Sequence, residues 1–76
     1  MKKADYLKIW GYLDILQSEF ESRHKLAEAK AADAATDEDK DRYGRLVRDY
    51  SKNTEELKEL KGKVEAEAER DYTHIF

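Results

Sequence analysis

Residues 31–39, AADAATDED, decide how this chain of 76 residues folds. Thr36 is a typical N-cap residue, and the carboxylate of Asp39, three residues later, gives a pattern close to a capping box. The acids that follow the cap suit the positive end of a helix dipole. A helix is therefore expected to begin at about residue 37. Neither glycine nor proline marks the segment before it, so the predicted bend depends on this cap.

Apolar residues recur at steps of three and four on both sides of this segment, which is the spacing of one helix face. The first series runs from Tyr6 to Ala34, and the second runs from Tyr43 to Ile75. Helix one is expected over about residues 3–34 and helix two over about residues 37–74. The predicted fold is all-α: one antiparallel two-helix hairpin over residues 1–76, which dimerises into a four-helix bundle.

One unbroken helix is the alternative, and it would be about 110 Å long at about 1.5 Å per residue. In such a rod, both apolar stripes would need outside partners along their whole length. We favour the hairpin, because a bend near Ala35 lets the two stripes cover each other. This bend places Phe20 beside Tyr50, and it places the Trp10 ring over Gly62, where a small residue would leave room for it.

The composition excludes several classes of protein. There is no cysteine and no proline, and 43% of the residues are charged. Without cysteine the chain has no disulfide framework, thiolate zinc site, iron–sulfur cluster or cysteine nucleophile. Eighteen acids against fifteen bases give a net charge of −3, which suits neither strong bulk attraction to nucleic acid nor an acidic tail.

No signal peptide or membrane span is expected. The basic start is followed by charges at Asp5, Lys8 and Asp14, which interrupt any apolar stretch. No run approaches the roughly 18 to 20 apolar residues that a bilayer requires. We therefore expect a soluble cytoplasmic protein without a membrane partner.

Helix one carries a wider apolar arc in its first half than one antiparallel helix can cover. The last residues of the chain are expected to extend past the shorter helix one and to lack a partner in the same molecule. Both features predict a protein partner, or self-association as a homodimer. The expected partner-binding residues are Ile9, Trp10, Tyr12, Leu16, Tyr72, Ile75 and Phe76.

A basic face on helix two supports an alternative function. Arg42, Arg45, Arg48 and Lys52 follow one another at steps of three, three and four, away from the apolar stripe. Such a face can contact phosphates, so a small dimeric nucleic-acid-binding regulator is the alternative prediction. Neighbouring aspartates dilute the face, and a solvated helix surface is the usual meaning of this pattern.

A second alternative is a carboxylate–histidine metal site. Glu21 and His24 have the Glu-x-x-His spacing that helical bundles use to bind metals. The opposite helix offers no carboxylate at that level, so we expect His24 to be a partly buried residue of the stripe. No cofactor is expected.

Catalysis is not expected either. The chain has no strained nucleophile turn, glycine-rich phosphate loop or dinucleotide-binding fingerprint. The architecture is similar in outline to small plasmid RNA-binding dimers, secretion cochaperones and phage-encoded inhibitors, but it shares no motif with them. The predicted function is a non-catalytic helical interaction module, such as a small regulator, inhibitor, adaptor or cochaperone, that docks an apolar helix face on a partner or on itself.

Overall fold

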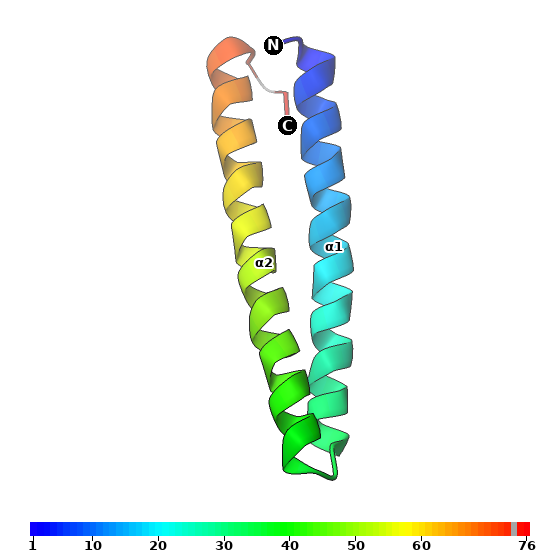
Figure 1. The fold of residues 1–76 in the computed structure, drawn as a ribbon. Coiled ribbons are helices and arrows are strands. Elements are labelled where there is room, and N and C mark those ends of the chain that lie inside the picture. Colours follow the sequence, from blue (N-terminus) through cyan, green and yellow to red (C-terminus); the bar gives the residue numbers. More distant parts are fainter. Residues whose placement is uncertain (74) are drawn as a thin grey trace.

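The computed structural model describes residues 1–73 and 75–76, and the regular structure in this part of the chain is helical. Helix α1 spans Lys3–Asp33 and helix α2 spans Asp37–Asp71. The two helices pack against each other in antiparallel directions, so that both ends of the chain lie at the open end of a hairpin 53 Å long (Figure 1). The predicted all-α fold with two packed helices is confirmed, and the unbroken rod is excluded.

The bend forms where the capping pattern predicts it. The Thr36 hydroxyl oxygen accepts a hydrogen bond of 3.1 Å from the backbone N–H of Asp39, and the Thr36 carbonyl accepts one of 3.0 Å from the N–H of Lys40. On the other side of the bend, the N–H of Ala34 donates to the carbonyl of Ala31 at 3.4 Å. Three residues therefore join the helices, and the cap satisfies one backbone donor at the start of α2.

Helix α2 ends at Asp71, before the expected limit near residue 74, which itself lies outside the described residues. Tyr72 has an extended backbone, with φ −140° and ψ 141°, and its N–H donates to the carbonyl of Ala68 at 2.7 Å. The chain therefore leaves the helix at Tyr72 and turns back over the open end (Figure 1).

The tail closes the open end of the hairpin. Ile75 is buried with Tyr6 and Ala68, and the half-buried Val64 and Tyr72 pack against them. We call these five residues the open-end cluster. The rings of Tyr6 and Tyr72 meet edge to face, with centroids 6.2 Å apart.

The expectation that the tail lacks an intramolecular partner is therefore wrong. The Tyr72 hydroxyl donates to the Met1 carbonyl at 3.1 Å, and the Phe76 ring lies 5.6 Å from the Trp10 ring, measured between centroids. Periodicity suggested that the apolar stripe of helix two continues to the end of the chain. The helix instead stops, and burial of Ile75 favours the folded-back tail.

In the middle of the hairpin the predicted pairing of Phe20 with Tyr50 is confirmed, with ring centroids 5.9 Å apart. The placement of Trp10 over Gly62 is wrong, because a Cβ added at Gly62 would meet nothing within 4 Å. The Trp10 indole N–H donates to Glu65 Oε1 at 2.7 Å, so the ring is turned toward this acceptor. Gly62 has no packing role.

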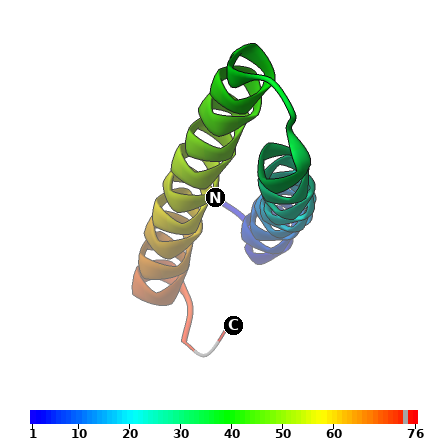
Figure 2. The same cartoon turned by 90° about the horizontal axis from the view of Figure 1, so that it is seen from below.

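The core is thin. Among the described residues, the buried apolar side chains are Tyr6, Ala27, Leu57, Ala68 and Ile75. Seen from the bend end, the molecule is a single layer of two helices (Figure 2). Each helix therefore has one neighbour, and most of its circumference faces solvent.

Replacing Thr36 by alanine removes the cap at the start of α2. We expect Thr36→Ala to lower the free energy of unfolding by about 1 kcal/mol, while Thr36→Ser, which keeps the hydroxyl, stays near the wild-type value. Urea unfolding followed by circular dichroism, at one fixed protein concentration, measures the difference. Equal stability of Thr36→Ala and the wild type would show that the bend does not depend on this cap.

Gly62→Ala should have the opposite effect. The added methyl group meets no neighbour, and alanine is favoured over glycine inside a helix by about 1 kcal/mol. We expect a gain of about that size in the free energy of unfolding. The reverse change at an exposed helical site, Ala66→Gly, serves as the control and should lose a similar amount. A loss of stability in Gly62→Ala would mean that a side chain approaches this backbone after all.

Candidate functional site

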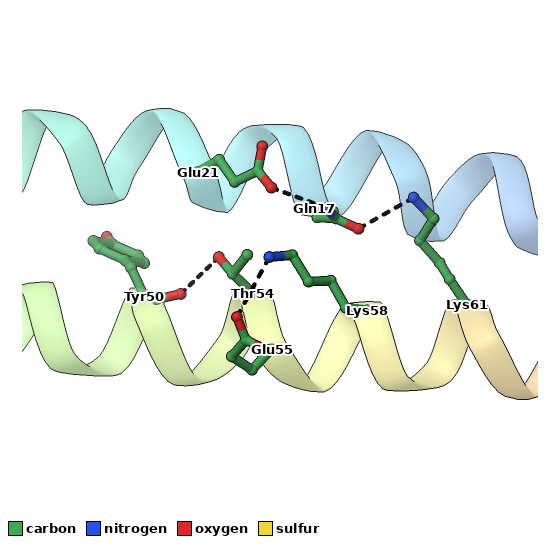
Figure 3. A network of polar contacts seen from close by, with 7 residues as sticks. All are labelled: Gln17, Glu21, Tyr50, Thr54, Glu55, Lys58 and Lys61. Carbon is green, nitrogen blue, oxygen red and sulfur yellow. Dashed lines mark hydrogen bonds and ion pairs between the residues drawn. The ribbon is translucent and has the colours of Figure 1, made fainter.

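One side of the hairpin is polar. Lys61 is only 14% exposed in its side chain, and its ammonium group contacts Asp14 Oδ1 at 2.7 Å and Gln17 Oε1 at 3.1 Å. The Gln17 amide in turn donates to Glu21 at 2.9 Å (Figure 3). Within the described residues, Asp14–Lys61 is the one ion pair that joins α1 to α2. We call this the polar side.

The polar side continues toward the bend as an open hollow of about 390 Å³. Charged and hydroxyl side chains from both helices line it: Glu21, His24, Lys25, Glu28, Ser51, Thr54, Glu55 and Lys58. Its hydroxyl and charged groups are largely satisfied locally. The Thr54 hydroxyl donates to the Tyr50 carbonyl at 2.8 Å, and Lys58 contacts Glu55 at 3.4 Å (Figure 3).

The opposite side of α1 carries an exposed apolar stripe. Tyr12 and Leu16 are each two residues from Asp14, and at about 100° per residue both lie nearly opposite it around the helix. Tyr12 is 65% exposed and Leu16 is 45% exposed. Ile9, three residues before Tyr12, extends the same row and is also exposed. We call Ile9, Tyr12 and Leu16 the α1 apolar stripe.

Helix α2 adds an apolar side chain to this side. Leu60 is exposed and lies two residues from Lys58, which lines the polar hollow, so Leu60 points to the other side of the hairpin. It follows the buried Leu57 by three residues. The exposed apolar surface is therefore continuous with the buried seam between the helices.

A second hollow lies further along this side, toward the bend. Arg23 follows Leu16 by seven residues, or about two helical turns, and so lies in the same row. The hollow measures about 200 Å³. Its lining is apolar and aromatic with a basic rim, formed by Arg23, Leu26, Ala27, Lys30, Tyr43, Leu46 and Tyr50. We call it the bend hollow.

The predicted partner-binding residues fall into two groups. The structure brings Ile9, Tyr12 and Leu16 together in one exposed row, whereas Tyr72 and Ile75 belong to the open-end cluster. Trp10 is half-buried and hydrogen-bonded to Glu65. The Phe76 ring lies beside the Trp10 ring and is partly exposed. Two exposed leucines on the apolar side, Leu26 and Leu60, were not predicted. Each is a leucine next to a position of the predicted apolar series, and this placement could have indicated that it is exposed.

The four residues of the nucleic-acid alternative are all exposed on α2. Arg42 is ion-paired with Asp39 at 2.9 Å, and its guanidinium lies 5.0 Å from the centroid of the Tyr43 ring. Arg45 lines a neighbouring hollow together with Arg42. Arg48 and Lys52 complete the row, and their role in binding phosphates stays a prediction.

The two residues of the metal alternative are engaged with neighbours on their own helix. His24 Nδ1 lies 2.8 Å from Glu28 Oε1, and Glu21 accepts the hydrogen bond from Gln17. Across the described residues, no group of three or more histidine or carboxylate side chains could hold a metal ion. A binuclear bundle site would need further ligands from another chain.

A buried phenol joins the two ends of the chain at the open-end cluster. The Tyr6 hydroxyl donates a short hydrogen bond to Asp71 Oδ2. This hydrogen bond, together with burial and the negative charge of Asp71, raises the pKa of Tyr6 to about 12. The neutral phenol is thus the form that fits the folded hairpin.

Comparison with protein-family models, with curated proteins and with solved structures gives no match to this chain. In the described part of the chain, neither helix combines the length and apolar character that crossing a membrane requires.

The raised pKa of Tyr6 predicts a specific loss of stability at alkaline pH. Its folded value of about 12 lies above the unfolded value of about 10, so the neutral phenol stabilises the hairpin fully below about pH 10. That contribution is lost as the pH rises through 12. Tyr6→Phe lacks the titrating group but keeps the ring, so comparing the two proteins isolates the contribution of the Tyr6 hydroxyl.

The stability difference between wild type and Tyr6→Phe should therefore be constant up to about pH 10 and then shift against the wild type. Chemical unfolding at a series of pH values measures it, and the difference in tyrosinate ultraviolet absorbance between the two proteins follows the titration of Tyr6. A difference that stays constant through pH 12 would contradict the role of the Tyr6–Asp71 hydrogen bond.

Proposed function

We propose that this chain is a non-catalytic protein–protein interaction module that docks the α1 apolar stripe on a helical surface. The observation that supports this most directly is the exposure of Ile9, Tyr12 and Leu16 in one row, continuous with the buried seam. Contiguous exposed apolar residues of this kind are typical of interaction sites. The proposed action is steric, through binding alone, and it needs no chemical step.

Tyr12 is proposed as the central contact. A tyrosine ring contributes a large contact area at little cost in conformational entropy, and its hydroxyl can remain at the hydrated edge of an interface. Leu16 and Ile9 flank it along the helix, and Leu60 widens the surface across α2. The proposed surface therefore belongs to both helices of the hairpin.

The other expected partner-binding residues have a supporting role in this proposal. Tyr72 and Ile75 hold the open end together, and the Phe76 ring packs beside Trp10. The partner can be another protein or a second copy of the chain. Two hairpins that cover each other's apolar sides would form a four-helix bundle, which is a common way to complete so thin a core.

Exchanging the stripe for polar residues tests this function. We expect Tyr12→Ser with Leu16→Gln to weaken association at least tenfold, because each side chain is expected to contribute more than about 1 kcal/mol at an interface. The helical content should be unchanged, since both side chains are exposed. Sedimentation equilibrium measures self-association, binding assays with purified partners measure other complexes, and circular dichroism measures helicity.

Leu7→Gln is a matched control. Leu7 is 43% exposed, nearly as much as Leu16, but it lies seven residues before Asp14 and so belongs to the polar side. This variant should associate like the wild type. If the double variant also associates like the wild type, the stripe is not the docking surface.

A further inference from the structure

We infer that the α1 apolar stripe is covered by a second copy of this chain with its ends reversed, so that Tyr12 of each copy enters the bend hollow of the other. This inference rests on the proposed function, and it identifies the partner of the docking surface as a second copy of the chain. Three observations support it: the area left exposed, the spacing of the stripe and the hollow, and the distribution of charge.

The exposed area is larger than a compact protein of this mass would have. The chain exposes 5756 Å², whereas a folded monomer of 8.9 kDa typically exposes about 4,800 Å². The excess is on the order of 900 Å². A stable interface of standard size removes about 800 Å² from each partner, so one copy of the chain supplies enough area for the other.

The stripe and the hollow are spaced symmetrically about the middle of the hairpin. The midpoint between Tyr12 and Ala27, which lines the bend hollow, lies close to Glu19, and α1 itself spans Lys3–Asp33. A twofold axis through that point, perpendicular to the helices, therefore brings each Tyr12 to the partner's hollow and overlaps the hairpins along most of their length. Such an isologous contact forms twice and closes the assembly.

The reversed orientation also fits the chemistry of the two features. Leu26 is 62% exposed and offers an apolar contact for an incoming ring, next to Ala27. Lys30 already lies 5.8 Å from the centroid of the Tyr43 ring and supplies a cation for a second aromatic face. With the same ends together, Tyr12 would lie at the level of the partner's Tyr12, about 15 residues along α1 from the level of the partner's bend hollow, and the two hollows would stay unfilled.

The charges favour the same orientation. Residues 1–20 hold three acids and three bases, and residues 53–76 hold seven acids and four bases, so the open-end half carries the whole net charge of −3. Residues 21–52 hold eight of each and are balanced. Placing equal ends together would bring two negative halves into contact. In the reversed orientation, each negative open-end half instead lies beside the basic rim of the partner's bend hollow.

A distance between the two bends tests the orientation. The chain has no cysteine, so Ala35→Cys provides one attachment point for a spin label at the exposed bend. In the reversed dimer the two labels should lie about 50 Å apart, since each bend is about 16 residues from the axis at about 1.5 Å per residue. Pulsed electron paramagnetic resonance on the frozen protein at about 100 µM measures this distance. A distance below about 20 Å, or a monomer at this concentration, would overturn the inference.

A variant pair tests the contact itself. Leu26→Gln and Tyr12→Ser should each weaken the dimer about tenfold, and the double variant should lose little more, because both changes remove the same contact. Additive losses would contradict a contact between these residues. Leu7→Gln should leave both the affinity and the label distance unchanged.

The results separate this inference from the proposed function. A dimer that depends on Tyr12 and Leu16 but shows a short label distance keeps the docking surface and refutes the reversed orientation. A monomer whose binding to another protein depends on the same residues keeps the docking surface and refutes the second copy. Association that ignores both residues refutes the function itself.

Discussion

A helix with one neighbour can bury only one stripe of its surface, and this constraint governs the whole molecule. In a single layer of two helices the buried seam is narrow, and few side chains are removed from water. The sequence supplies more apolar residues than the seam can hold. Some of the surplus is used at the open end, where the tail turns back on Tyr6 and Ala68. Much of the rest stays exposed, and the stripe around Tyr12 on α1 is part of it.

The polar side shows how the two helices are turned relative to each other. Asp14, Gln17 and Lys61 connect the helices across that side through an ion pair and a hydrogen bond. The Lys61 ammonium group is largely buried between these two acceptors, so this contact favours the arrangement in which Asp14 and Gln17 face α2 on the polar side. The orientation of the Tyr12 row toward the other side follows from this arrangement.

Short-range sequence patterns predicted the fold well, but contacts between residues far apart in the sequence were missed. The Thr36 cap and the spacing of three and four residues were enough to place the bend and the pairing of Phe20 with Tyr50. The end of α2 could not be read, because the apolar spacing continues to Ile75 although the helix stops at Asp71. Of the candidate surface, the exposed row on α1 was predicted, but the folded-back tail depends on contacts between distant parts of the chain.

In this hairpin, the sequence separation between contacting residues grows with their distance from the bend. Those beside the bend close a few residues, whereas the Tyr6–Asp71 hydrogen bond closes a segment of 65. Loop-closure entropy makes the short segments form first, so folding should proceed like a zipper from Thr36 toward the ends. The open end should then form last and unfold first, and the contacts of the aromatic tail stabilise that end in the folded hairpin.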